Sequence, residues 1–135
     1  DVPLLARDRD DGAVAAARDN AERAGVAADL DVARATVSDL AAPGGCPAGW
    51  VLTNPPYGHR VRGGADLRDL YARLGQVARA AVPGWDVGLL VGDPTLARHT
   101  GLPLRPRWRS TNGGITVHFL ATGTAPGTTA DPAGD

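Results

Sequence analysis

The chain has 135 residues, which is enough for one domain with one sizeable hydrophobic core. Apolar residues make up 43% of it but aromatic residues only 4%, so Ala, Val and Leu must supply the packing, and a disordered chain is excluded. A single cysteine, Cys46, excludes a disulfide framework and favours a reducing cytoplasm. The net charge of −1 argues against a domain that binds nucleic acid without help from another part of the protein.

Strand-like and helix-like segments alternate through the first half, which predicts an α/β fold with a mostly parallel sheet. A short apolar strand covers residues 2–7. The helix that follows is capped by Asp10 or Asp11, runs to about residue 24, and stops at Gly25, which can adopt the left-handed conformation without penalty. A second strand is expected over residues 30–38, with Asp39 at its end.

The second half continues the alternation. Its longest apolar run covers residues 87–91, far short of the roughly 20 residues that a membrane-spanning helix needs, so no membrane segment is expected. Residues 122–135 are predicted to form a disordered tail. The expected elements are a short buried strand (50–53), a helix capped by Asp66 and ended at Pro83-Gly84, a buried strand (86–92), a short helix after Pro94, and an antiparallel hairpin (104–110 and 115–121) around Asn112-Gly113.

The segment that indicates chemistry is Asn54-Pro55-Pro56-Tyr57, directly after the strand at 50–53. This position is the carboxyl edge of the sheet, where α/β folds bind ligands. The prolines remove two N–H donors, keep their carbonyl acceptors and stiffen the loop. The Asn54 side-chain oxygen and the Pro55 carbonyl can therefore each accept one hydrogen of a ligand amine, and Tyr57 can stack on the ring that carries it.

Such a pair of acceptors suits an exocyclic amino group on a nucleic-acid base. That nitrogen is a weak nucleophile because its lone pair is delocalised into the ring. Two fixed acceptors orient the lone pair toward an electrophile and stabilise the positive charge that develops on alkylation. An ordinary Asn-Pro-Pro turn with Tyr57 covering the core is the competing interpretation, and the position after a buried strand favours the functional one.

Residues 53–58 together with Arg60 resemble the catalytic motif of the RNA guanine-N2 methyltransferases that carry a THUMP domain, whose bacterial members methylate 23S rRNA. The segment Asp8-Arg9-Asp10 and the following helix to Val26 are similar to the cofactor-side strand and helix of that family. The resemblance covers about residues 2–121. It implies a Rossmann-like class I methyltransferase fold that uses S-adenosyl-L-methionine (SAM).

Residue by residue, the resemblance implies that Asp8 binds the ribose hydroxyls of SAM and that Asp39 lies near its adenine. Asn54, Pro55, Pro56 and Tyr57 would form the catalytic loop. Asn54 would also contact the cofactor, and Tyr57 with Arg60 would contact the RNA substrate. The His residues have no spacing typical of metal ligands, so no metal is expected.

The family's glycine-rich loop after its first strand has no counterpart here, since no glycine pair opens a helix after a strand. We therefore expect residues 1–121 to be a partial catalytic domain, with the family's first strand and helix missing at the N-terminus. RNA, and rRNA above all, would be bound through a longer parent protein. Three alternatives stay open: a DNA adenine-N6 methyltransferase, a protein glutamine-N5 methyltransferase, and an inert truncated chain.

Overall fold

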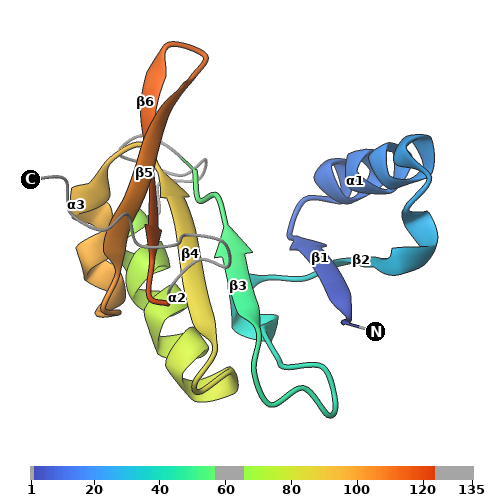
Figure 1. Cartoon of the computed structure of the whole chain (residues 1–135), viewed down its shortest axis with the longest axis horizontal. Coiled ribbons are helices and arrows are strands. Elements are labelled where there is room, and N and C mark those ends of the chain that lie inside the picture. Colours follow the sequence, from blue (N-terminus) through green and yellow to red (C-terminus); the bar gives the residue numbers. More distant parts are fainter. Residues whose placement is uncertain (1, 57–65, 124–135) are drawn as a thin grey trace, which may run out of the picture. The chain divides into compact units, whose positions relative to one another are not determined.

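The computed structural model describes residues 2–56 and 66–123. The chain divides into two compact units, the first ending at Pro47 and the second beginning at Ala48. Both are drawn in Figure 1, and each is described by itself.

The first unit contains a parallel strand pair and one long helix. Strand β1 (Leu4–Asp8) pairs with β2 (Leu30–Arg34) from Leu4 opposite Leu30 to Asp8 opposite Arg34. Helix α1 (Asp11–Ala24) connects them and buries the predicted positions Val14 and Ala21. Two short 3-10 turns complete the unit, η1 (Ala27–Asp29) and η2 (Val37–Asp39).

Both predicted ends of α1 are confirmed. The Asp10 side chain accepts a hydrogen bond from the backbone N–H of Ala13, so Asp10 is the N-cap. Gly25 at the other end has φ of 72°, a left-handed conformation that favours glycine. The helix is therefore delimited by the signals that the sequence carries.

The predicted second strand was too long. It was expected to reach residue 38, but β2 ends at Arg34, and η2 occupies Val37–Asp39. The backbone N–H of Thr36 donates to Asp39 Oδ2 at 2.7 Å, and the Asp39 N–H donates to the Thr36 carbonyl at 3.0 Å. These local hydrogen bonds bend the chain into a turn, and Asp39 consequently lies beyond the strand rather than at its end.

The second unit is a four-stranded mixed sheet in the order β3-β4-β6-β5. Strand β3 (Trp50–Thr53) is parallel to β4 (Asp86–Val91), as predicted. Strands β5 (Arg105–Asn112) and β6 (Ile115–Ala121) form the expected antiparallel hairpin, and β6 pairs antiparallel with β4. Helix α2 (Leu67–Ala81) joins β3 to β4, while α3 (Pro94–Ala97) and η3 (Arg98–Thr100) follow β4.

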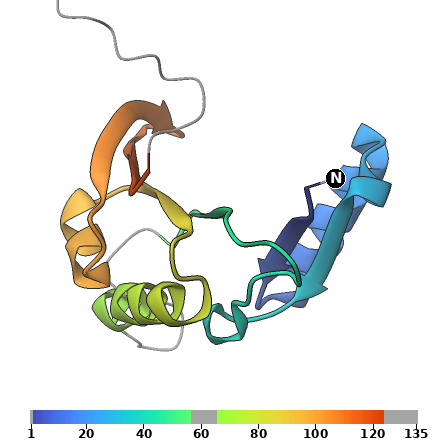
Figure 2. The same cartoon turned by 60° about the horizontal axis from the view of Figure 1, so that its bottom comes forward.

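The core of the second unit lies between α2 and one face of this sheet, the arrangement drawn in Figure 2. Asp66 caps α2, as predicted, by accepting from the backbone N–H of Arg68. Alternate residues of β4 point into the core and are buried, as expected for period-2 strands. The buried apolar side chains of this unit are Leu67, Tyr71, Leu74, Val77, Ala78, Val82, Val87, Leu89, Val91, Ala97, Val117, Leu120 and Ala121.

Strands β1 and β3 expose apolar side chains. Strand β3 was expected to be buried, yet Leu52 is 66% exposed. Leu4 and Leu5 are consecutive in β1 and so point to opposite faces, and both are exposed. Among the described residues, β1 pairs only with β2 and β3 only with β4.

The end of the sheet extends slightly beyond the predicted domain boundary at residue 121. The Thr122 N–H donates to the Val87 carbonyl at 3.0 Å, and its hydroxyl oxygen accepts from the Val87 N–H at 2.9 Å. Thr122 therefore continues the pairing with β4. Residues 124–135 of the expected tail lie outside the described residues.

Candidate functional site

Asp8 is the last residue of β1, and its side chain is exposed at the carboxyl end of the parallel pair. Its Oδ1 accepts the Asp10 N–H at 2.8 Å, and its carbonyl oxygen accepts the Ala35 N–H at 2.9 Å. In the described part of the chain, no hydrogen bond reaches the second carboxylate oxygen, Oδ2. The carboxylate is thus held in place while one oxygen stays available to accept from a ligand.

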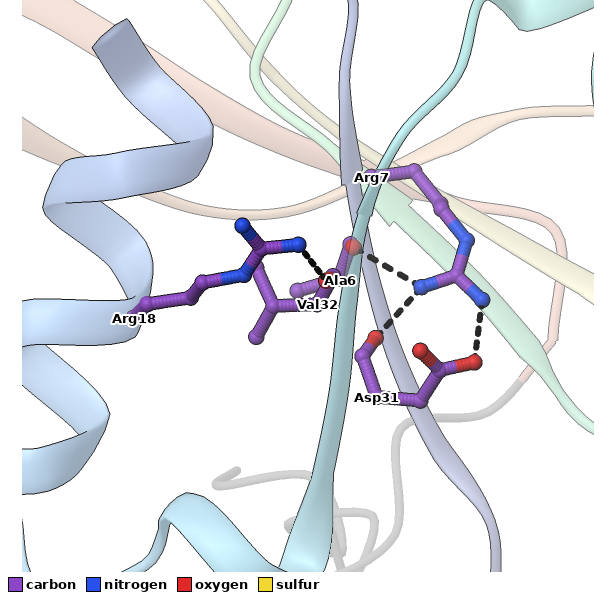
Figure 3. Close-up of polar contacts among 5 residues, drawn as sticks. All are labelled: Ala6, Arg7, Arg18, Asp31 and Val32. Carbon is purple, nitrogen blue, oxygen red and sulfur yellow. Dashed lines mark hydrogen bonds and ion pairs between the residues drawn. The ribbon is translucent and has the colours of Figure 1, made fainter. Parts of the chain in front are cut away.

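Three arginine side chains hold together the structure around Asp8, which consists of strands β1 and β2, helix α1 and the loop after Asp8. Arg18 of α1 donates to the Val32 carbonyl of β2 at 2.8 Å, while Arg7 of β1 donates to the Asp31 carbonyl and forms an ion pair with its carboxylate. Figure 3 shows Arg18 reaching β2 from the side of α1 and Arg7 reaching it from the other side.

The third of these arginines holds the loop that follows Asp8. Arg34 Nε donates to the Arg9 carbonyl at 3.0 Å and lies 3.5 Å from a carboxylate oxygen of Asp11. Sequence reasoning missed all three arginines, because their partners lie 14 to 25 residues away along the chain and leave no local pattern.

Asp39 lies at the same edge of the first unit as Asp8. The link is a short run of hydrogen bonds: the Asp8 carbonyl accepts from Ala35, and the next residue, Thr36, donates both its N–H and its hydroxyl to Asp39 Oδ2 at 2.7 Å. These two donors lower the pKa of the Asp39 carboxyl, with the backbone N–H contributing most. Asp39 is therefore an exposed, anchored carboxylate. The Thr-x-x-Asp spacing of 36–39 is the signal that could have identified this turn.

The Asn-Pro-Pro segment lies where the sequence predicted it. Asn54 directly follows β3, whose last residue, Thr53, is opposite Leu89 of β4, so the segment leaves the carboxyl edge of a parallel pair. Asn54 and Pro56 are exposed, whereas Pro55 is buried. Because Pro55 is buried, it anchors this loop to the second unit, and Pro56 after it has no backbone N–H donor. The Asn54 side chain stays accessible.

The remaining candidate residues stand as follows. Tyr57 and Arg60 lie outside the described residues. Asp8 and Asp39 share an edge of the first unit, whereas Asn54 belongs to the second unit. Over residues 2–56 and 66–123, no group of three or more His, Cys, Asp or Glu side chains could hold a metal ion. No helix within the same ranges is long and apolar enough to cross a membrane.

The sequence matches a known family and its curated members. Residues 1–114 match a family model described as "RMKL-like, methyltransferase domain". The chain is 38% identical over 119 residues to the ribosomal RNA large subunit methyltransferase K/L of Syntrophotalea carbinolica, covering 87% of this chain and 17% of that protein. The enzyme of the same name from Chromohalobacter salexigens is 38% identical over 118 residues, 87% of this chain and 16% of the relative. The chain thus spans about a sixth of the length of these relatives.

Solved structures show the same fold. TrmN from Thermus thermophilus is 28% identical and superposes with a TM-score of 0.65 over 88% of this chain and 35% of that one. The N-terminal domain of human METTL16, crystallised with SAH, gives a TM-score of 0.60 over 87% of this chain and 50% of that one, at 15% identity. The expected Rossmann-like class I methyltransferase architecture, with parallel strands and a C-terminal antiparallel hairpin, is therefore confirmed.

Proposed function

Since this chain belongs to the RMKL-like methyltransferase domain family, we propose that it forms part of an enzyme that methylates the exocyclic amino group of a base in RNA. The proposed target is guanine N2 in large-subunit ribosomal RNA. The observation that carries the proposal is the exposed Asn54 with its two following prolines at the carboxyl edge of the β3–β4 pair.

The residues proposed to bind the cofactor belong to the first unit. When bound, SAM supplies a methyl group made electrophilic by its sulfonium. The exposed, anchored carboxylates of Asp8 and Asp39 fit the donors of such a ligand. Asp8 Oδ2 can accept from ribose hydroxyls, because only Oδ1 is used by the Asp10 N–H. Asp39 can accept from the adenine amino group through the oxygen that Thr36 leaves free.

The residues proposed to hold the target amine belong to the second unit or lie outside the described residues. The Asn54 side-chain oxygen and the Pro55 carbonyl accept the two amine hydrogens, which turns the nitrogen lone pair toward the methyl donor. As the nitrogen–carbon bond forms, the methyl–sulfur bond breaks and its electron pair stays on sulfur, which becomes a neutral thioether. The two acceptors stabilise the positive charge that develops on nitrogen, and the nitrogen then releases one proton to water. No strong base is required, because the alkylated amine is acidic. Tyr57 would hold the base by stacking, and Arg60 would contact the RNA.

The relatives support the choice of substrate and cofactor. The curated relatives are named as large-subunit rRNA methyltransferases, which favours RNA over DNA adenine and over protein glutamine. SAH, which the METTL16 structure contains, is the product that SAM leaves after methyl transfer. An rRNA substrate would also place the protein in the cytoplasm, where ribosomes are assembled.

The test is methyl transfer from radiolabelled SAM to purified large-subunit rRNA, to duplex DNA and to a peptide release factor, with nucleoside digests separated by mass spectrometry. We expect label in N2-methylguanosine alone. Label in N6-methyladenine of DNA or in the release factor would replace the proposal by one of the alternatives. Failure to bind SAM in calorimetry, with no label in any substrate, would identify an inert chain.

A further inference from the structure

The hairpin and the residues just before it carry positive charge only. Residues 94–123 contain four arginines and neither Asp nor Glu, although the whole chain has a net charge of −1. The acidic residues of the described chain lie before this segment. The charge is therefore segregated along the sequence, and the hairpin is its basic end, which favours a polyanionic partner.

One face of the hairpin combines this charge with an open aromatic ring. Strand β5 lies at one edge of the four-stranded sheet. Arg105 is opposite Ala121 and Trp108 is opposite Phe119, and a register shift between Pro106 and Trp108 inserts one extra residue. Since Ala121 and Phe119 are two residues apart on β6, they share a face, and Arg105 and Trp108 share it with them.

Polar residues continue this face toward the hairpin tip. Ser110 is opposite Val117, and Asn112 is opposite Ile115, so both lie on the side of Trp108. Both are exposed and both carry hydrogen-bond donors. We call the surface formed by Arg105, Trp108, Ser110 and Asn112 the Trp108 face.

Trp108 packs on one neighbouring ring and is still largely accessible to solvent. Its ring stacks on Phe119 with centroids 5.5 Å apart and an interplanar angle of 23°. Trp108 is nevertheless 51% exposed, so about half of its surface stays accessible while its ring contacts Phe119. Phe119 is itself half-buried and lies on the neighbouring strand, opposite Trp108. A flat ring of this kind is suited to stack on another planar group.

The other two arginines of β5 are placed differently. Arg107 donates to the Gly123 carbonyl and is half-buried. Arg109 is opposite His118 and follows Trp108 directly, so it points to the opposite face. Arg105 is therefore the β5 arginine that is exposed beside Trp108.

We propose that the Trp108 face binds a single-stranded segment of the RNA substrate, with one base stacked on Trp108 and an adjacent phosphate held by Arg105. Stacking requires an unpaired base, because bases in a duplex already stack on each other. Ser110 and Asn112 supply further donors for phosphate or ribose oxygens. The inference rests on the proposed function for the identity of the polymer. It adds a contact surface on the hairpin, apart from the Asn54 loop.

The experiment measures binding of the protein to a fluorescein-labelled single-stranded RNA of 12 nucleotides by fluorescence anisotropy, at several salt concentrations. Trp108→Ala should weaken binding by about 5- to 150-fold, the range for loss of one stacked base. Trp108→Phe should restore most of it, because a flat ring returns. Arg105→Ala should weaken binding about fivefold at 0.1 M salt and reduce the log–log salt slope by about 0.7, the value for one phosphate contact on a single strand.

Arg109→Ala is the matched control. It removes the same charge from the same strand but from the opposite face, and we expect an effect below about twofold. Circular dichroism of each variant checks that the hairpin is folded. Equal losses for Arg105→Ala and Arg109→Ala would mean diffuse electrostatic attraction and would overturn the proposal.

Other outcomes would overturn it as well. These are unchanged binding by Trp108→Ala, absence of RNA binding by the unaltered protein, or equal affinity for a duplex of the same length. A change in oligomeric state on Trp108→Ala without a change in RNA affinity would identify the face as a protein interface instead.

The proposed function is tested separately by the methyl-transfer assay. A protein that methylates RNA with unchanged RNA affinity in these variants would refute this surface alone, and one that binds RNA here but methylates none would refute the proposed function alone.

Discussion

Replacing Gly75 of α2 by alanine should loosen the layer that supports the β3–β4 pair. Gly75 is buried where α2 crosses η3. A Cβ at this position would lie 1.8 Å from the Thr100 carbonyl oxygen and 2.6 Å from its carbonyl carbon, whereas real Cβ contacts are essentially never under 3.0 Å. The obstructing atoms are backbone, so the helix and the 3-10 turn must separate by roughly 1 Å. Overpacking of this kind typically costs about 1–3 kcal/mol.

Two further terms can be assigned from the contacts. The Thr100 carbonyl accepts from Arg79 Nη1 at 2.9 Å, and a Cβ pressed against that oxygen would break this part-buried hydrogen bond, at a cost of about 1 kcal/mol. Alanine gains about 1 kcal/mol over glycine in a helix interior, which offsets that loss. The expected net destabilisation of Gly75→Ala is therefore about 2 kcal/mol.

Urea unfolding followed by circular dichroism measures this difference. Gln76→Ala, at the exposed neighbouring position, is the control, and its free energy of unfolding should stay within about 0.5 kcal/mol of the original. Arg79→Ala isolates the hydrogen-bond term. If Gly75→Ala left the midpoint unchanged or raised it, α2 and η3 would not approach as closely as the backbone contact requires, and the reasoning would be refuted.

In the methyl-transfer assay, Asn54→Ala should lower turnover about 10²- to 10³-fold with little change in SAM affinity. Asp8→Ala should first weaken SAM binding, as measured by calorimetry. If both variants changed only SAM affinity, the proposed division of roles would be wrong. Because the pKa of Asp39 is lowered in the folded chain, its contribution to stability is present above the ordinary carboxyl pKa and is lost as pH falls through the lowered value. Thr36→Ala removes the hydroxyl donor but keeps the N–H, so a carbon-detected NMR titration should show the Asp39 pKa move part of the way back up; an unmoved pKa would mean that the hydroxyl contributes nothing. Gly25→Ala should destabilise the first unit by about 1–2 kcal/mol, because alanine would have to adopt φ of 72°. A Cβ at this position would contact no other atom within 4 Å, so the backbone strain alone sets the cost. An unchanged melting temperature in thermal unfolding would contradict this.

The candidate site was predictable to the extent that its residues follow strands directly. Asp8 ends β1 and Asn54 follows β3, as expected, since apolar runs and flanking polar residues mark strand ends in the sequence. Asp39 was assigned to the end of a strand that in fact stops at Arg34. Residues 35–38 have the β-branched and apolar character of a strand, and the hydrogen bonds between Thr36 and Asp39 outweigh that propensity.

By itself the sequence determined the elements whose signals are local. Caps at Asp10 and Asp66, the stop at Gly25 and the Asn112-Gly113 hairpin all depend on residues within a few positions of each other, and all are confirmed. Only the tertiary structure decided which residues hold together the structure around Asp8, why α2 requires Gly75, and which face of the hairpin carries Trp108 and Arg105. These depend on contacts between residues 11 or more positions apart and on a one-residue register shift in β5. Composition and periodicity do not specify such pairings, because a shift of one residue moves a side chain to the opposite face of a sheet.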